Sequence, residues 1–136
     1  MNLDPEWQDR LVQAALEARS RAYVLYSHYS VGAAVLTSSG RTFTGCNIEN
    51  AAYPTTMCAE RVAIFKAVSE GEREFIAIAV VTSNAGMSCG GCRQVMAEFG
   101  LDTLVLTAND NGRVVHKSTV SEMLPDAFTP QDLPRQ

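Results

Sequence analysis

The run FIAIAVVT, residues 75–82, restricts the fold of this chain more than any other segment. It is continuously apolar and rich in β-branched residues, which is typical of a central strand covered on both faces. Such a strand needs helices on both sides of its sheet. Periodic or apolar segments at residues 5–22, 57–70 and 90–99 predict three of them. The run therefore predicts an α/β fold with three layers.

Shorter strands are predicted on either side of this run. Residues 29–50 read as a hairpin whose two strands are joined by a tight turn at residues 38–40. Residues 103–108 and 112–118 supply two more strands around a second turn. The resulting order, α-β-β-α-β-α-β-β, predicts a mixed five-stranded sheet in an α-β-α sandwich.

The ends of the predicted helices carry local signals. Asp4 suits the N-cap of the first helix, and Pro5 suits its first position. Thr55 or Thr56 is expected near the cap of the second helix, which Gly71 closes. The middle of that second helix is apolar on nearly every face, so we expect burial on more than one side.

Length and charge narrow the range of functions. The 136 residues favour a single domain, residues 1–136, with a tail after about residue 130 that frays. The formal net charge is −4 and the eleven basic residues form no run, which argues against nucleic acid or an anionic membrane as a partner. Neither a signal segment nor an apolar run of membrane-spanning length is visible, so we expect a cytoplasmic protein.

Three cysteines at the starts of two predicted helices form a candidate metal site. Cys89 and Cys92 form a C-x-x-C pair, which by itself also fits half of a zinc ribbon or a redox pair. A redox pair would be expected earlier, after the first strand of a βαβ pattern, and a ribbon needs a second such pair, which the sequence lacks. Cys58 adds a third thiolate. Three ligands with one open position are typical of catalytic zinc.

The fourth cysteine would close this site if it also bound the metal. Cys46 lies in the predicted strand GCNIEN, in which neighbouring side chains alternate between faces. Asn47 and Glu49 share the polar face, which is the one expected to meet a ligand. Cys46 is therefore predicted to be an ordinary buried residue, and a closed structural site with four thiolates is the less favoured alternative.

Two charged residues follow Cys58 directly. Helix N-termini favour the thiolate form of Cys58 and Cys92, both of which we place in the first turn of a helix. Arg61 is expected to donate hydrogen bonds to the ligating sulfurs and to offset their negative charge. The alternatives are a solvated Arg61 and a Glu60 that only complements the helix dipole.

The stretches CAER, residues 58–61, and CGGCRQ, residues 89–94, resemble the signature of the cytidine deaminase family. The segments YSHYSVGAA, GCNIENAAYP, RVAIFKAVSEG and LPDAF are also similar to that family, so the resemblance covers about residues 20–130. A cysteine replaces the first histidine of the general zinc deaminase signature, as in the short, homotetrameric nucleoside deaminases. The resemblance implies the same three-layer fold.

The resemblance also implies a role for each residue of the candidate site. Cys58, Cys89 and Cys92 would hold one Zn²⁺ per chain, and Glu60 would move protons. A neighbouring subunit of a homotetramer would lend two residues to the site, Tyr53 and Phe128. Contacts to the nucleoside would come from the ring of Tyr29 against the pyrimidine, the backbone at Ala59 against the base edge, and Asn47 and Glu49 at the sugar hydroxyls.

The implied activity is zinc-dependent hydrolytic deamination of cytidine and deoxycytidine to uridine and deoxyuridine, with release of ammonia, in pyrimidine salvage. No organic cofactor is implied. Three positions depart from the family pattern. Tyr29 stands in place of the usual phenylalanine, and Ser30 and Ser88 stand in place of prolines. Without a proline there, the loop from Ser83 to Ser88 is expected to be looser, which leaves the substrate range open.

Three alternatives to this activity remain. A deaminase that edits polynucleotides would use the same metal site but needs a basic groove. A deaminase of modified cytosines or of nucleoside antibiotics such as blasticidin S would differ only in substrate range. A zinc-binding module without enzymatic activity would not need Glu60. The two histidines, His28 and His116, are expected to be exposed and are not needed as ligands.

Overall fold

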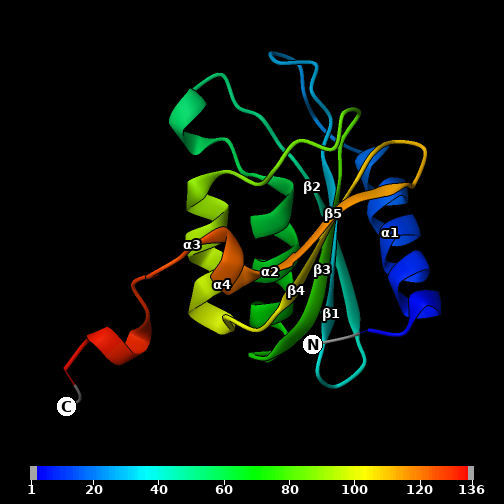
Figure 1. Ribbon diagram of the computed structural model, residues 1–136. Coiled ribbons are helices and arrows are strands. Elements are labelled where there is room, and N and C mark those ends of the chain that lie inside the picture. Colours follow the sequence, from blue (N-terminus) through cyan, green and yellow to red (C-terminus); the bar gives the residue numbers. More distant parts are fainter. Residues whose placement is uncertain (1–2, 135–136) are drawn as a thin grey trace.

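Figure 1 shows the computed structural model of the chain, which describes residues 3–134. The elements follow one another in this order: α1 (Pro5–Arg19), β1 (Gly32–Thr37), β2 (Thr42–Cys46), η1 (Tyr53–Thr55), α2 (Ala59–Ser69), β3 (Phe75–Val81), α3 (Gly90–Phe99), β4 (Leu104–Ala108), β5 (Val114–Thr119), α4 (Val120–Met123) and η2 (Pro130–Asp132).

The five strands form one mixed sheet in the order β2-β1-β3-β4-β5. The pair β3–β4 is parallel, and the other three pairs are antiparallel. The predicted mixed five-stranded sheet is therefore confirmed, with the apolar run of residues 75–82 as its central strand. Because β3 and β4 are parallel, the chain must cross over between them, and α3 forms this crossover. The loops before and after α3 therefore start and end at fixed positions of the sheet.

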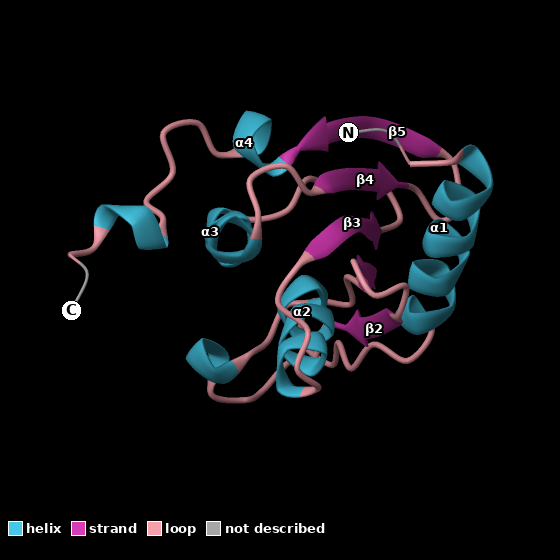
Figure 2. Ribbon diagram, turned by 90° about the horizontal axis from the view of Figure 1, so that it is seen from below, coloured by secondary structure: helices cyan, strands magenta, loops and turns pink. Residues whose placement is uncertain are grey.

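The sheet lies between two layers of helices, with α1 on one face and α2 and α3 on the other (Figure 2). Strand β1 contributes to both layers because successive side chains point to opposite faces. Ala34 and Leu36 pack toward α1, whereas Ala33 and Val35 pack toward α2 and α3. The predicted α-β-α sandwich is confirmed. That the chain is a single domain stays a prediction.

Helix α1 begins as predicted but ends three residues early. Its N-cap is Asp4, whose Oδ1 accepts a hydrogen bond from the N–H of Glu6 at 2.8 Å. The prediction that the helix reaches residue 22 is wrong. The N–H groups of Ser20, Arg21 and Ala22 bond to carbonyls three residues back, which tightens and ends the helix. The apolar Ala22 extended the periodic pattern beyond the last α-helical turn.

Helix α2 starts later than the sequence indicates, and neither threonine is its N-cap. The N-cap is Cys58, with φ −72° and ψ 149°. Met57 lies outside the helix because its backbone exchanges two hydrogen bonds, of 2.9 and 3.0 Å, with the backbone of Ile48. Sequence periodicity cannot reveal such a pairing, since it joins residues that are distant in the chain.

The apolar middle of α2 is buried on one side only within this chain. Ala63 and Ile64 are buried, but the side chain of Phe65 is 43% exposed. The expectation of burial on more than one side is therefore not met by the single chain.

The segment after β5 contains structure that the sequence reasoning missed. Thr119 and Glu122 form a capping box that starts the short helix α4. The sequence predicts that the tail after about residue 130 frays. Its described part contains η2, which starts with a second capping box between Thr129 and Asp132. The last two residues, 135–136, lie outside the described part. No helix within residues 3–134 is long and apolar enough to cross a membrane.

Candidate metal centre and active site

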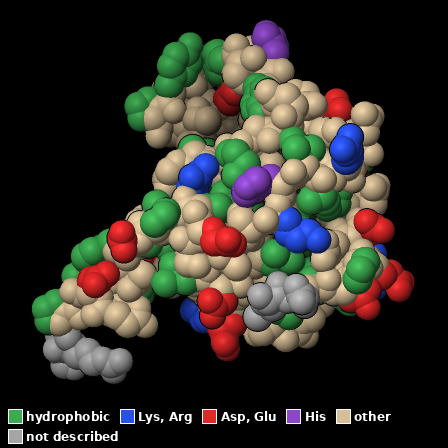
Figure 3. Space-filling view, viewed as in Figure 1, with side chains coloured by type: hydrophobic (Ala, Val, Ile, Leu, Met, Phe, Trp, Pro, Cys, Tyr) green, Lys and Arg blue, Asp and Glu red, His purple; other side chains and the backbone are tan. Residues whose placement is uncertain are grey.

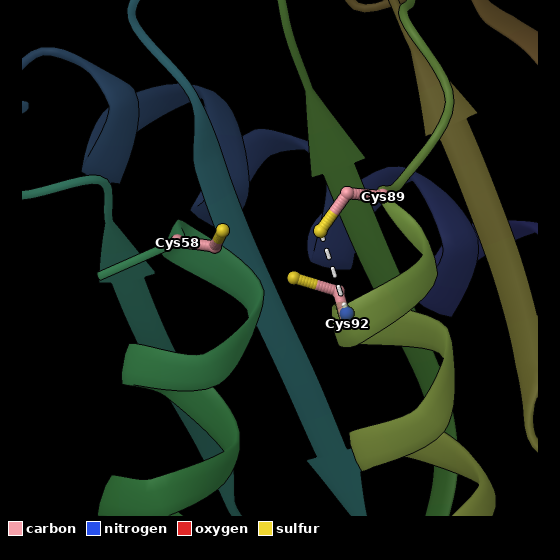
Figure 4. Close-up of side chains that lie close together, drawn as sticks. All are labelled: Cys58, Cys89 and Cys92. Carbon is pink, nitrogen blue, oxygen red and sulfur yellow. Dashed lines mark hydrogen bonds between the residues drawn. The ribbon is translucent and has the colours of Figure 1, made fainter. Parts of the chain in front are cut away.

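Three thiols meet where α2 and α3 begin (Figure 4). Cys58 is the N-cap of α2, Cys89 is the N-cap of α3, and Cys92 lies in the first turn of α3. The three sulfur atoms all lie within 4.8 Å of one another. The placement of Cys92 in a first turn is confirmed, whereas Cys58 precedes its helix by one position. Both helix starts still direct partial positive charge at the sulfurs.

The donor set fits zinc. Four tetrahedral bonds of 2.3 Å would place ligating sulfurs about 3.8 Å apart, which three side chains already within 4.8 Å reach with small adjustments. Cys46 is not part of the cluster, because its thiol points away and donates to the carbonyl of Arg21 at 3.4 Å. Three sulfurs leave a fourth tetrahedral position free for another ligand.

The prediction that Cys46 is buried is wrong in degree, since the residue is only half-buried. It ends β2, which is an edge strand of the sheet. An edge strand has no neighbouring strand on its outer side, so its residues are less covered. The sequence does not show which strand lies at the edge of the sheet.

The thiols influence one another strongly. A hydrogen bond from the thiol of Cys92 lowers the pKa of Cys58 to about 6, and Arg61 acts in the same direction. The same hydrogen bond and burial raise the pKa of Cys92 above the usual thiol range. The lowered pKa favours the thiolate form of Cys58, which is the form that binds a metal ion.

Arg61 extends from the first turns of α2 to the same sulfurs. Its Nη2 donates to Sγ of Cys89 at 3.8 Å, and hydrogen bonds with Cys92 and Cys89 raise its own pKa. Its Nε is buried and has no hydrogen-bond partner within residues 3–134. The guanidinium thus lies against the thiol cluster, and the solvated alternative does not describe its position.

A glycine that the sequence analysis overlooked lies directly beside this guanidinium. A Cβ atom at Gly91 would lie 2.8 Å from Nη2 of Arg61. The small residue inside the C-x-x-C pair therefore leaves room for the guanidinium. An arginine at the third position after Cys58, combined with glycine inside the pair, is the sequence signal that could have indicated the contact.

A cleft opens beside the thiols, with a volume of about 280 Å³. Glu60, at 5% exposure, lines it together with Cys58 and Cys89. The cleft thus brings together seven of the predicted site residues: Tyr29, Asn47, Glu49, Cys58, Ala59, Glu60 and Cys89. The remaining wall comes from residues that the sequence analysis did not single out: Ser27, Val31, Thr56, Met57, Val80, Thr82, Gly86 and Met87. Thr82 follows the central strand directly, and the carboxyl end of a strand is where ligands bind in open α/β sheets.

Asn47 and Glu49 are held in place by neighbouring backbone. The amide of Asn47 accepts from the N–H of Val31 at 2.9 Å and donates to the carbonyl of Tyr29 at 2.8 Å. Glu49 accepts from the hydroxyl of Ser27 and from two backbone N–H groups, those of Ser27 and Tyr26, each at 3.0 Å. These bonds, the Ser27 hydroxyl first, lower the pKa of Glu49. Its carboxylate is therefore charged at neutral pH.

Tyr53 and Phe128 lie outside the cleft. Tyr53 is 69% exposed in η1, where its ring meets that of Tyr26 edge-on at 5.6 Å between centroids. Phe128 is exposed on the tail, whose backbone carbonyl at this residue accepts from the side chain of Gln94. Within one chain the structure does not bring these two residues to the thiols.

The remaining sequence expectations concern polar residues near the site. His28 and His116 are both exposed, as predicted. Ser88 is buried, and its hydroxyl has no hydrogen-bond partner within residues 3–134. Ser30 holds Arg19 through its backbone carbonyl at 3.0 Å. The looseness expected for the loop that ends at Ser88 stays a prediction.

Known proteins are similar to this chain in sequence and in fold. A family model, described as the cytidine and deoxycytidylate deaminase zinc-binding region, matches residues 5–108. A cytidine deaminase of Halalkalibacterium halodurans is 52% identical over 126 residues, which are 90% of this chain and 95% of the relative. A blasticidin-S deaminase of Bacillus cereus is 33% identical and covers 88% of this chain and 90% of its own. The crystal structure of cytidine deaminase from Burkholderia pseudomallei is 44% identical with a TM-score of 0.84, covering 93% of this chain and 100% of that chain. The chain therefore belongs to the family of zinc-binding cytidine and deoxycytidylate deaminases.

Proposed function

We propose that this protein hydrolytically deaminates cytidine and deoxycytidine to uridine and deoxyuridine and releases ammonia. The observation that carries the proposal is one cleft lined by a buried carboxylate, Glu60, directly beside a cluster of three thiols. Relatives that are 52% and 44% identical over most of the chain bear the name cytidine deaminase, which supports the same reaction here.

The metal supplies one part of the chemistry. Cys58, Cys89 and Cys92 would hold the zinc, which when bound would supply a Lewis acid that lowers the pKa of water toward neutrality. Arg61 supports this role because its guanidinium offsets the negative charge of the thiolates.

Glu60 supplies the other part. Its carboxylate takes a proton from the attacking water and delivers it to N3 of the cytosine ring. The water oxygen bonds to C4, and Glu60 then takes the second proton from the new C4 hydroxyl and gives it to the amine. The C4–N bond breaks, ammonia leaves, and C4 keeps the oxygen as a carbonyl. A group that serves these transfers must reach the cleft without binding the metal. Glu60 meets this requirement, because it lines the cleft and is not part of the cluster of three sulfurs.

The nucleoside is oriented by the far wall of the cleft. Asn47 and Glu49 offer an amide and a charged carboxylate to the sugar hydroxyls, and both are fixed by hydrogen bonds before any ligand arrives. The ring of Tyr29 packs against the pyrimidine, and the backbone at Ala59 contacts the base edge. Such preorganised groups avoid the entropic cost of ordering on binding.

The assembly we propose is a homotetramer in which neighbours lend Tyr53 and Phe128 to each site. Both side chains are largely exposed, and neither lines the cleft of its own chain. Figure 3 shows hydrophobic side chains gathered on the projection that carries η1. Phe65 adds further exposed apolar surface on α2. Contact with other subunits would bury these groups.

We place the protein in the cytoplasm, as one domain that serves pyrimidine salvage. Cys58, Cys89 and Cys92 must stay reduced to hold the metal, and a reducing compartment preserves such thiols. The net charge of −4 and the carboxylates of the cleft disfavour a polynucleotide substrate. A blasticidin-S deaminase among the relatives makes nucleoside antibiotics the second candidate substrate class.

The test is release of ammonia by the purified, zinc-containing protein. Cytidine, deoxycytidine, blasticidin S and a short single-stranded oligonucleotide are compared at equal enzyme concentration. We expect turnover of the two free nucleosides and none of the oligonucleotide. Turnover of blasticidin S alone would select the second candidate. A zinc-loaded protein that releases no ammonia from any of them would leave the zinc module as the better interpretation.

A further inference from the structure

A hydrogen bond at the wall of the cleft joins two loops that are distant in the chain. The phenol hydroxyl of Tyr29, between α1 and β1, donates to Oδ1 of Asn84, between β3 and α3, at 2.7 Å. The contact does not involve the metal cluster or the proposed proton carrier. It lies on the wall of the site, where Tyr29 is 38% exposed.

The loop on the far side of this bond has its own internal support. The hydroxyl of the buried Thr82 donates to Oδ1 of Asn84 at 3.3 Å and accepts from the N–H of Gly86 at 2.8 Å. The amide oxygen of Asn84 therefore accepts from two hydroxyls at once. Tyr29 is tied to a folded turn rather than to a single free side chain.

Gly86 presses directly on the same phenol. A Cβ atom at this position would lie 2.5 Å from Oη of Tyr29, so the backbone itself forms the contact. The phenol is thus confined by Asn84 through a hydrogen bond and by Gly86 through close packing. Neither the ring nor the loop can move outward without breaking one of these contacts.

The two loops that the bond joins continue toward opposite parts of the proposed site. Tyr29 follows Ser27, which holds Glu49 at the proposed sugar end. Gly86 precedes Cys89, which belongs to the metal end. A ring whose sugar reaches Glu49 and whose reacting carbon reaches the metal must therefore lie alongside the joined walls.

We propose that the Tyr29–Asn84 hydrogen bond is a latch that fixes residues 82–88 as one wall of the cleft and so excludes pyrimidine rings with bulky substituents. The substrate class in this proposal rests on the proposed function. Tyr29 and Asn84 are in this view positioning and specificity residues, since they shape the space around the ring and take no part in proton transfer.

The first test measures the loop without any substrate. Amide hydrogen exchange of residues 82–88 is compared in the parent, Tyr29→Phe, Asn84→Ala and the control Ser83→Ala. Ser83 lies in the same loop, is exposed and makes no side-chain hydrogen bond within residues 3–134. Loss of one hydrogen bond should speed exchange about threefold to tenfold in the first two variants, and not in the control. Equal exchange in the parent and Tyr29→Phe would overturn the latch.

The second test measures the ring preference. We compare kcat/KM for N4-methylcytidine with that for cytidine in the parent, both single variants and the double variant. The ratio should rise about threefold to tenfold in each single variant, and the double variant should gain no more than the larger single, because both lack the same bond. An unchanged ratio, or gains that multiply in the double variant, would overturn the proposal.

The two tests separate this proposal from the proposed function. If the parent turns over neither nucleoside, the proposed function fails, and the exchange experiment still decides whether the latch exists. A second outcome is that the parent turns over cytidine while the Tyr29→Phe variant has the same amide exchange and the same ratio of kcat/KM values as the parent. In that case the proposed function stands and the latch is rejected.

Discussion

Nη2 of Arg61 lies so close to Gly91 that a single methyl group on the glycine would sit 2.8 Å from it. The arginine comes from α2 and the glycine from α3, so the contact joins the two helices that carry the thiols. Arg61 donates to Sγ of Cys89 from a position that a side chain at residue 91 would make it leave in part. The placement of the guanidinium at the thiols is therefore sensitive to a residue that carries no functional group.

Arg61→Gln and Gly91→Ala should have related effects for this reason. Both variants should retain zinc, since all three sulfurs remain, and both should turn over cytidine more slowly, because the thiolates would keep their full negative charge and weaken the Lewis acid. Metal content and kcat are measured side by side. Unchanged kcat in both variants would show that the guanidinium has no influence on the metal.

The metal ligands are tested by comparing two cysteine variants. Cys89→Ala should lose zinc, because two sulfurs remain where three are needed. Cys46→Ala should keep one zinc per chain, since its thiol donates to the carbonyl of Arg21 instead. Elemental analysis of both purified proteins gives the answer. Loss of zinc from the Cys46 variant would revive the closed structural site.

Glu60→Gln should abolish most of the activity and leave the rest of the site intact. Glutamine keeps the size of the side chain but cannot carry protons between water, N3 and the amine. One acid/base step contributes about 10²–10⁴-fold, and Glu60 serves more than one, so the loss should reach or exceed the top of that range. Zinc content and cytidine affinity should stay at parent levels. Turnover within about tenfold of the parent would remove Glu60 from the mechanism.

Sugar binding should respond to acid through Glu49. Its folded pKa is depressed, chiefly by the Ser27 hydroxyl, so the charged form is present at neutral pH and is lost only as pH falls below the usual glutamate range, about 4.3. We expect a KM for cytidine that stays flat from neutral pH toward that value and rises below it. In Ser27→Ala the pKa moves back up, and the rise should begin at higher pH. Loss of metal in acid would lower kcat, whereas protonation of Glu49 would raise KM. The two effects can therefore be separated by measuring both parameters.

Shared active sites can be tested by complementation. Tyr53→Ala and Glu60→Gln should each be nearly inactive alone. When they are expressed together, some sites combine an intact Glu60 with an intact Tyr53 from a neighbour, and part of the activity should return. The molar mass from light scattering should correspond to four chains. An active monomer, or a mixture no more active than its components, would contradict the proposed assembly.

The sequence was most informative where chemistry and periodicity coincide. The central strand, the helix starting at residue 90 and the three thiol ligands of the cluster could all be predicted, because each depends on local pattern or on a small set of reactive side chains. The start of α2 could not, since the pairing of Met57 with Ile48 depends on how two distant segments meet. The half-buried state of Cys46 likewise depends on the place of β2 at the sheet edge. The Tyr29–Asn84 bond belongs to the same class of long-range contact.

The three thiols come from two helix starts that flank the central strand, and this arrangement has a consequence for how the protein matures. The sulfurs meet in the folded chain, in which the starts of α2 and α3 lie side by side. A bound ion would link the two helix starts, and because it would bind the native state and not the unfolded chain, it would shift the folding equilibrium toward the native state. A chelator would weaken the architecture along with the chemistry, and metal supply in the cell would set how much of this protein persists.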